Sequence, residues 1–230
     1  MGGWWTALGV LVAASGSACG SASDRQVPVS IAIASASPST PTAPVVTPCK
    51  NLVECSRSCE RKEARSCGRL GEMYSLGAGV ERDPLKAKAA LERGCDLGGG
   101  DACATLAQLQ RETGRAGAEV SASAARACEA GAGAGCSMLE PMVRHGLDIP
   151  IDLARADQLQ AKALKLLATS CDAGDFNACF QLSPLVWDGV GAAADPAAGA
   201  KLKRRGMELQ RRACANGDVL ACDAAARRAS

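Results

Sequence analysis

Five pairs of cysteines with one spacing constrain the fold of this chain more than any other feature. The two members of each pair are eight residues apart, at 59/67, 95/103, 128/136, 171/179 and 214/222. In one continuous helix, such residues are separated by roughly 12 Å of rise, whereas a disulfide needs α-carbons roughly 4–7 Å apart. The chain must therefore reverse between the cysteines, which predicts a helix, a turn and an antiparallel helix joined by a disulfide.

The residues between the paired cysteines fit this turn. A glycine follows the first cysteine by three residues in four pairs, and glycine readily takes the left-handed conformation that ends a helix. Asp175 and Asp218 come next and are suited to cap the following helix. In the first pair Lys62 replaces the glycine, so we expect that pair to close differently. The four glycines are Gly98, Gly131, Gly174 and Gly217.

Disulfides are the favoured interpretation of these cysteines, with metal binding and redox catalysis as alternatives. No C-x-x-C motif occurs and the chain has a single histidine, which disfavours both alternatives. Cys49 and Cys55 form a sixth couple with a different spacing. The predicted disulfide cysteines are Cys49, Cys55, Cys59, Cys67, Cys95, Cys103, Cys128, Cys136, Cys171, Cys179, Cys214 and Cys222.

The pairs recur every 33 to 43 residues, which is the period of a helical-hairpin repeat. Asp83-Pro84 and Asp195-Pro196 are typical helix starts, with a capping aspartate and a proline in the first turn. Within 153–167, apolar residues at helical spacing predict one buried stripe: Leu153, Ala156, Leu159 or Gln160, Ala163 and Leu167. No stretch alternates as a strand would, so we predict an all-α solenoid of antiparallel helix pairs stapled by disulfides.

The N-terminal residues indicate export. Residues 1–19 contain an apolar run from Trp4 to Ala14, too short to span a bilayer, and end in small residues and Cys19. This resembles a bacterial lipoprotein signal, with Cys19 as the lipidated residue, although Gly16 departs from the pattern and no basic residue precedes the run. Ordinary cleavage nearby is the alternative. Gly20, rather than Asp, resembles outer-membrane sorting.

Residues 20–48 are dominated by Ser, Ala, Pro and Thr and predict a disordered linker. Residues 49–230 then form the repeat domain. The predicted location is the outer membrane, the periplasm or the exterior, with contact to a membrane only through the lipid anchor. We expect a monomer.

Residues 70–95, "LGEMYSLGAGVERDPLKAKAALERGC", resemble a Sel1-like repeat, which is related to the tetratricopeptide repeat. The matching positions are Leu70, Gly71, Tyr74, Gly77, Gly79, Val80, Asp83, Lys86 and Ala87. The cysteine pairs resemble a secreted, cysteine-rich bacterial branch of that family. The resemblance implies stacked helix pairs in a right-handed superhelix whose concave groove binds a protein or peptide, here an unknown envelope partner.

The same resemblance implies an enzyme alternative, because some cysteine-rich members are described as binding or slowly hydrolysing β-lactams. The sequence lacks a Ser-x-x-Lys and a Lys-Thr-Gly motif, and its sole histidine, His145, cannot form a multi-histidine zinc site. "VRHG" instead places His145 at a helix end. We therefore favour a scaffold and predict no catalytic residue, cofactor or metal.

Charge excludes the strongly basic footprint of a nucleic-acid-binding protein, because the net charge is +2. The basic stretch 201–212 could bind an acidic partner or an anionic polymer. The favoured interpretation is the solvated face of a repeat helix, because Leu202, Met207 and Leu209 interleave with the charges. Gly77-x-Gly79 is better explained by turn chemistry than by phosphate binding.

Overall fold

The structure is a computed structural model that describes residues 49–229. Within this range every regular element is an α-helix, which confirms the all-α prediction. The helices are α1 (Leu52–Glu60), α2 (Ala64–Leu76), α3 (Pro84–Asp96), α4 (Gly100–Glu112), α5 (Gly117–Glu129), α6 (Gly133–His145), α7 (Leu153–Asp172), α8 (Phe176–Asp188), α9 (Pro196–Ala215) and α10 (Val219–Ala229).

Disulfides staple each odd-numbered helix to the next even-numbered one. Five of them join the end of one helix to the start of the following helix, with α-carbons 4.5 to 4.7 Å apart. The sixth, Cys49–Cys55, ties the segment before α1 onto α1. The other five bonds are Cys59–Cys67, Cys95–Cys103, Cys128–Cys136, Cys171–Cys179 and Cys214–Cys222.

The turns inside the disulfide loops follow the predicted chemistry. The four glycines have left-handed backbones, with φ between 83° and 99°. Lys62 takes the same conformation, with φ of 65°, so the expectation that the first pair closes differently was wrong. The side chain of Asp175 accepts hydrogen bonds from the N–H groups of Asn177 and Ala178 and thereby caps α8.

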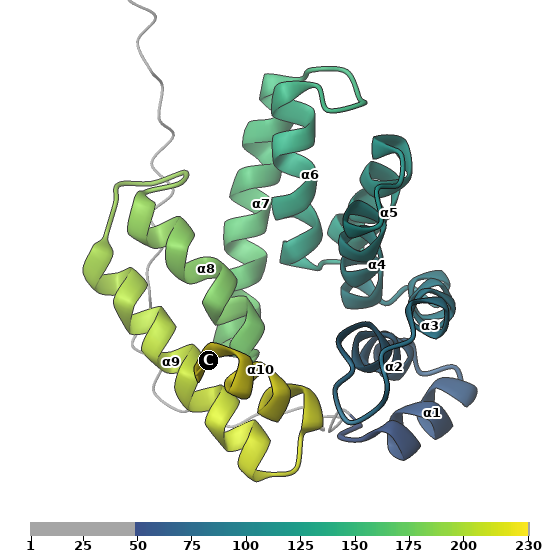
Figure 1. The fold of residues 1–230 in the computed structure, drawn as a ribbon. Helices are drawn as coiled ribbons and strands as arrows, with labels where there is room; N and C mark the ends of the chain where they lie inside the picture. The colour runs from purple at the N-terminus through teal and green to yellow at the C-terminus, as the bar shows by residue number, and fades with distance from the viewer. Residues whose placement is uncertain (1–48, 230) are drawn as a thin grey trace, which may run out of the picture.

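Consecutive helices pack as antiparallel neighbours, and the even-numbered helices also contact one another from α2 to α8. Figure 1 shows the result as a curved stack in which α2, α4, α8 and α10 border a central space, with α1, α3, α5 and α9 outside them. Much of the core is alanine and cysteine. Small residues allow this close packing: a Cβ added at Gly135 would lie 2.4 Å from the Cβ of Ala127.

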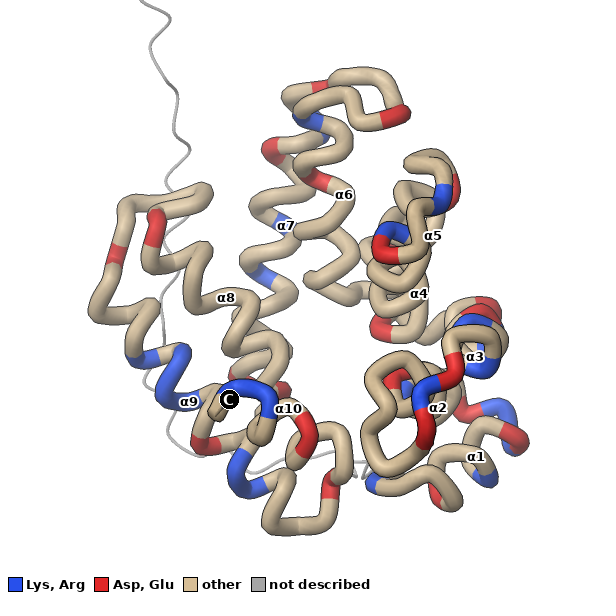
Figure 2. Tube along the Cα trace, in the orientation of Figure 1, with Lys and Arg blue, Asp and Glu red and all other residues tan. Residues whose placement is uncertain are grey.

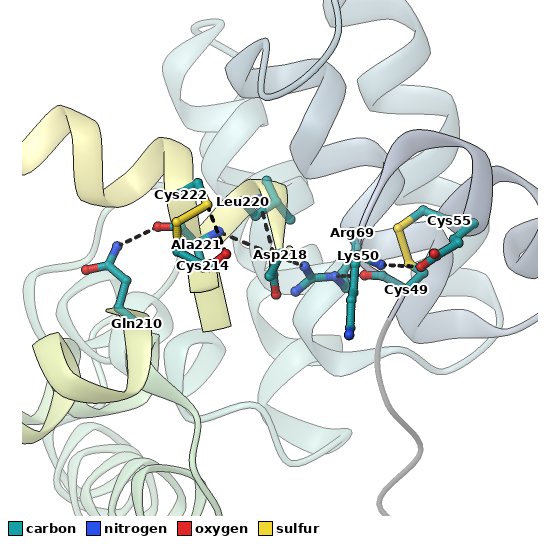
Figure 3. Close-up of polar contacts among 11 residues, drawn as sticks. Cys49, Lys50, Cys55, Arg69, Gln210, Cys214, Asp218, Leu220, Ala221 and Cys222 are labelled. Carbon is teal, nitrogen blue, oxygen red and sulfur yellow. Dashed lines mark hydrogen bonds and ion pairs between the residues drawn. A yellow bond between two sulfur atoms is a disulfide. The ribbon is translucent and has the colours of Figure 1, made fainter. Parts of the chain in front are cut away.

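The last helix returns to the first, in what we call the joint between α10 and α1–α2 (Figure 1). The N–H of Val219 donates to the carbonyl of Lys50 at 3.1 Å. Arg69 donates to the carbonyl of Cys49 at 2.8 Å and pairs with Asp218 at 2.5 Å, as Figure 3 shows. Asp218 in turn caps α10 by accepting from the N–H groups of Leu220 and Ala221.

Apolar contacts reinforce the joint. Leu220 is buried in one cluster with Cys55, Met73 and Ala78, and a Cβ added at Gly79 would lie 2.7 Å from a methyl carbon of Val219. The described part of the chain therefore closes on itself. The last helix thereby uses its apolar residues to cover the first repeat.

The stripe predicted for 153–167 is correct in part. Ala156, Ala163 and Leu167 are buried, whereas Leu153 is exposed and Leu164 is buried instead. Leu153 is the first residue of α7, next to the capping Asp152, so it lies at the rim of the stack. Among residues 49–229, no helix combines the length and the apolar character needed to cross a membrane.

Candidate functional site

The candidate site is a pocket of about 620 Å³ between α8 and α9, which we call the α8–α9 pocket. Its size is within the range typical of ligand-binding clefts. Its walls combine aromatic, aliphatic and basic side chains. They are Phe180, Ser183, Pro184, Trp187 and Asp188 from α8, and Ala200, Lys203, Arg204 and Met207 from α9.

Helical spacing explains why these side chains face one space. Phe180, Pro184 and Trp187 follow each other at steps of four and three residues, so they lie on one face of α8. Ala200, Lys203, Arg204 and Met207 have the same relation on α9. Two helices that pack side by side thus present a broad, mostly apolar hollow. Trp187 is 48% exposed there and Met207 is 38% exposed.

Two glycines of α9 bring the helices close together beneath the pocket. A Cβ added at Gly199 would lie 2.9 Å from the Cβ of Trp187 and from the carbonyl oxygen of Ser183. One added at Gly206 would lie 3.1 Å from the ring of Phe180. The hydroxyl of Ser183 donates to the carbonyl of Gly199 at 2.9 Å. The floor of the pocket is therefore a fixed helix crossing.

Arg228 of α10 stacks on Phe180, one of the residues that line the pocket. Its guanidinium carbon lies 3.8 Å from the centre of the Phe180 ring, a cation–π arrangement. The same side chain donates to the amide oxygen of Gln210 at 2.7 Å. The ring of Phe180 also packs edge-on against Phe176. The ring of Phe180 is therefore contacted from α8, α9 and α10.

In the preceding repeat this register is covered. Leu164 on α7 and Met207 on α9 each lie seven residues before the first cysteine of their disulfide loop. Leu164 is 1% exposed, because the loop after α8 packs on it at Gly191. Met207, in the same register, is 38% exposed. No described residue covers the α8–α9 pocket as that loop covers α7.

The charges around the pocket are unbalanced. Lys201, Lys203 and Arg204 form no ion pair with any residue of the described range, whereas Arg205 pairs with Asp172 of α7. Further along α9, Arg211 and Arg212 both pair with Glu208. Asp188 is the one acidic side chain among the pocket residues. Figure 2 shows the resulting basic positions along α9.

A separate titratable group lies on the inner row of helices. Burial of the Glu72 side chain on α2 raises its pKa to about 7. Arg69 opposes this shift, and the carboxylates of Asp101, Asp175 and Asp218 add to it. These groups come from α2, α4, α8 and α10, so closing the ring gathers acidic charge near Glu72. They form no metal-binding cluster among the described residues.

The remaining sequence-predicted residues are placed as follows. His145 is the last residue of α6, is exposed, and is followed by the left-handed Gly146, as expected for a helix end. Cys19 lies outside the described residues. In 201–212 the structure separates the expected apolar stripe: Leu202 is buried, but Met207 faces the α8–α9 pocket.

Sequence reasoning missed the pocket itself. Phe176, Phe180 and Trp187 are three of the four aromatic residues in the repeat domain, and this clustering around α8 was the available signal. The clustering of aromatic residues did not reveal which side of α8 stays uncovered, because this depends on how α10 packs along α9.

No protein-family model matches the chain, and no curated protein matches it. Solved structures with similar folds are a Sel1 repeat protein from Oxalobacter formigenes (21% identity, TM-score 0.45, 74% of this chain) and a protective antigen of uropathogenic Escherichia coli displaying an SLR fold (19%, 0.42, 75%). A putative sel1 repeat protein from Klebsiella pneumoniae subsp. pneumoniae is similar too (18%, 0.46, 79%).

The match covers 65% of the Oxalobacter chain, 34% of the Escherichia chain and all of the Klebsiella chain. Identities of 18 to 21% and TM-scores of 0.42 to 0.46 leave the function of this chain open.

Proposed function

We propose that this chain is a Sel1-like repeat scaffold, attached to the cell envelope, that binds a protein partner through the α8–α9 pocket. The observation that carries the proposal is the exposure of Met207 at a register where Leu164 is buried. A position that the preceding repeat covers with its own chain is a surface on which a partner segment can pack. Exposed apolar patches of this kind mark interaction sites.

The repeat assignment rests on the motif in residues 70–95 and on the helix-pair architecture. Gly77 and Gly79 have left-handed backbones in the turn after α2, and Asp83 caps α3 by accepting from the N–H groups of Leu85 and Lys86. These are the structural roles that the motif implies. No observation in the described range favours the β-lactam alternative.

The envelope assignment rests on the sequence of residues 1–48 and on the disulfides. Six disulfides in one small domain are typical of proteins from oxidising compartments. A lipid on Cys19, followed by Gly20 and a linker to residue 48, would hold the repeat domain away from an outer membrane. Replacement of Cys19 by Ser should then move the protein from the membrane fraction to the soluble fraction, whereas unchanged fractionation would contradict the anchor.

Site-specific photocrosslinking tests the pocket. A photoreactive phenylalanine analogue in place of Trp187 should form an adduct with one protein, identified by mass spectrometry, in cells that express the full chain. The same analogue in place of Val53, which is also exposed but lies on α1, is the control. The identified protein, once purified, should bind the unmodified chain and lose affinity for a Trp187→Ala variant. Equal adducts at both positions, or none, would refute the proposal.

A further inference from the structure

The residues that line the α8–α9 pocket indicate the chemistry of its occupant. We infer that its occupant is a short protein segment with an apolar core flanked by acidic residues. This inference rests on the proposed function and adds the chemistry of the partner. Three independent features support it: the shape of the hollow, the loop that fills the equivalent register, and the unpaired charge.

Shape favours a peptide segment over a flat surface. The side chains of Phe180, Trp187 and Met207 border a hollow of about 620 Å³. Gly199 and Gly206 bring α9 close to α8, and Arg228 stacks on the ring of Phe180. A membrane surface would be met by apolar side chains that protrude, whereas a hollow accepts side chains from a partner.

The preceding repeat indicates what kind of segment fits. There the turn Gly189-Val190-Gly191 follows α8, and Gly191 packs against Leu164 and Gln160 of α7. The equivalent register on α9 offers Met207 and Lys203, which lie four residues apart on the pocket wall. A partner segment with small and aliphatic residues can therefore pack here in the way that the chain's own turn packs on α7.

The positive charge of the pocket indicates which residues flank the apolar core of the partner segment. The equivalent of Lys203 on α7 is Gln160, a neutral residue, and the equivalent of Arg204 is Ala161. Two positions of α9 in the pocket thus carry cations where the equivalent positions of α7 carry neutral side chains, although Arg144 of α6 donates to Gln160 there. Both lack an ion-pair partner within the described range, and Asp188 balances at most one of them. Burying two unpaired cations beneath a neutral segment would be costly, so a partner with carboxylates at its rim is favoured.

Trp187 provides a direct probe of occupancy. The other tryptophans, Trp4 and Trp5, lie in the N-terminal signal. In the full chain with Trp4→Phe and Trp5→Phe, intrinsic tryptophan fluorescence reports on the pocket alone. The probes are synthetic peptides that share one leucine-rich core and differ only in their flanking residues, which are glutamate, glutamine or lysine.

We expect the glutamate peptide to shift the fluorescence of Trp187 and to bind about tenfold more tightly than the glutamine peptide at low salt, with the preference shrinking as salt is added. The lysine peptide should bind most weakly. A Lys203→Glu/Arg204→Glu variant should reverse this order. A Lys162→Glu/Lys165→Glu variant changes the net charge equally at exposed positions of α7 and should keep it.

The other outcomes overturn the inference in distinguishable ways. Equal binding of the peptides would contradict the preference for acidic residues but would still support a protein-binding pocket. If no peptide bound, the proposed function would be contradicted as well. A shift of Trp187 by anionic phosphatidylglycerol vesicles, with none by the peptides, would make the surface a membrane contact. Binding that appears only after deletion of residues 20–48 would make that segment the occupant.

Discussion

The joint and the α8–α9 pocket both lie near the end of the stack, but the joint is buried within the chain whereas the pocket stays exposed. At the joint, α10 places Leu220 into a buried cluster and Asp218 beside Arg69, so both apolar and charged groups are satisfied within the chain. The described lining of the pocket comes from α8 and α9 alone, and Trp187 and Met207 stay exposed although Arg228 of α10 stacks on Phe180. One short helix therefore completes the first repeat but does not cover the last.

This difference separates two surfaces that one helix borders. Asp218 caps the start of α10, whose first residues supply the apolar contacts of the joint, and in the last turn Arg227 donates to the carbonyl of Leu76 on α2 while Arg228 stacks on Phe180 beside the pocket. Changes at the joint should alter the free energy of unfolding. Changes in the pocket should alter binding with little effect on folding. Variants in each region test whether the two are independent.

The largest effect is expected for Arg69→Ala. Removing one partner of a largely buried ion pair leaves the other charge without compensation, and we expect the free energy of unfolding to fall by about 3 kcal/mol. Urea denaturation measures this loss. The N–H of Val219, which donates to Lys50, should also exchange faster with deuterium, because the joint opens.

Arg61→Ala is the matched control for this prediction. Arg61 also pairs with a carboxylate, that of Glu63, but both side chains are exposed. Exposed pairs contribute little, so the loss should be below about 1 kcal/mol. Equal losses for the two variants would show that the joint is no more important than any surface contact.

The second effect concerns the disulfide that holds α10. For a loop of this length the chain-entropy model gives about 2.5 kcal/mol, so Cys214→Ser/Cys222→Ser should lower the free energy of unfolding by that amount. Cys128→Ser/Cys136→Ser opens a loop of equal length between α5 and α6, which pack on α4 and α7 rather than on the joint, and should cost about as much. Only the first variant should speed deuterium exchange in α1 and α2. Faster exchange there in both variants would contradict a local role.

Local chemistry explains how much of this fold could be predicted from the sequence. The cysteine spacing, the glycines and the capping aspartates act within one turn, so the helix pairs and their ends follow from the residues nearby. The joint does not, because Arg69 and Asp218 are 149 residues apart and nothing near either residue indicates the other. The α8–α9 pocket depends on what α10 leaves uncovered, so it too required the structure.

The third effect is a pH dependence centred on Glu72. Its folded-state pKa of about 7 exceeds the value of 4.5 for an unperturbed glutamate, so the folded state holds the proton more tightly than the unfolded state does. The stabilising contribution is therefore complete below about pH 4.5 and is lost as the pH rises through 7. The full shift corresponds to at most about 3 kcal/mol, and partial solvent access to Glu72 reduces this to about 1 kcal/mol.

Glu72→Gln tests this dependence. Between about pH 5 and pH 8, the range in which Glu72 titrates, the variant should lose less stability than the parent chain. Thermal unfolding followed by circular dichroism measures this loss. Glu129→Gln on α5, an exposed residue with no ion pair in the described range, is the control and should follow the parent chain. Parallel pH profiles for all three proteins would show that burial does not raise the pKa of Glu72 in the folded state.

The smallest effect on stability is expected for Trp187→Ala, and it most sharply separates the two surfaces. Trp187 is half exposed and borders a hollow, so its truncation leaves no closed cavity, and we expect a smaller loss than at a fully buried position. Leu182→Ala, five residues earlier on α8 and fully buried, should cost about 2–4 kcal/mol by the usual penalty for a core cavity. Urea denaturation compares the two variants.

If Trp187→Ala destabilised the fold as much as Leu182→Ala does, Trp187 would be a core residue between α8 and α9. The exposed tryptophan would then be explained by folding alone. A small loss, together with loss of binding to the partner captured at that position, would show that α8 presents this residue for recognition.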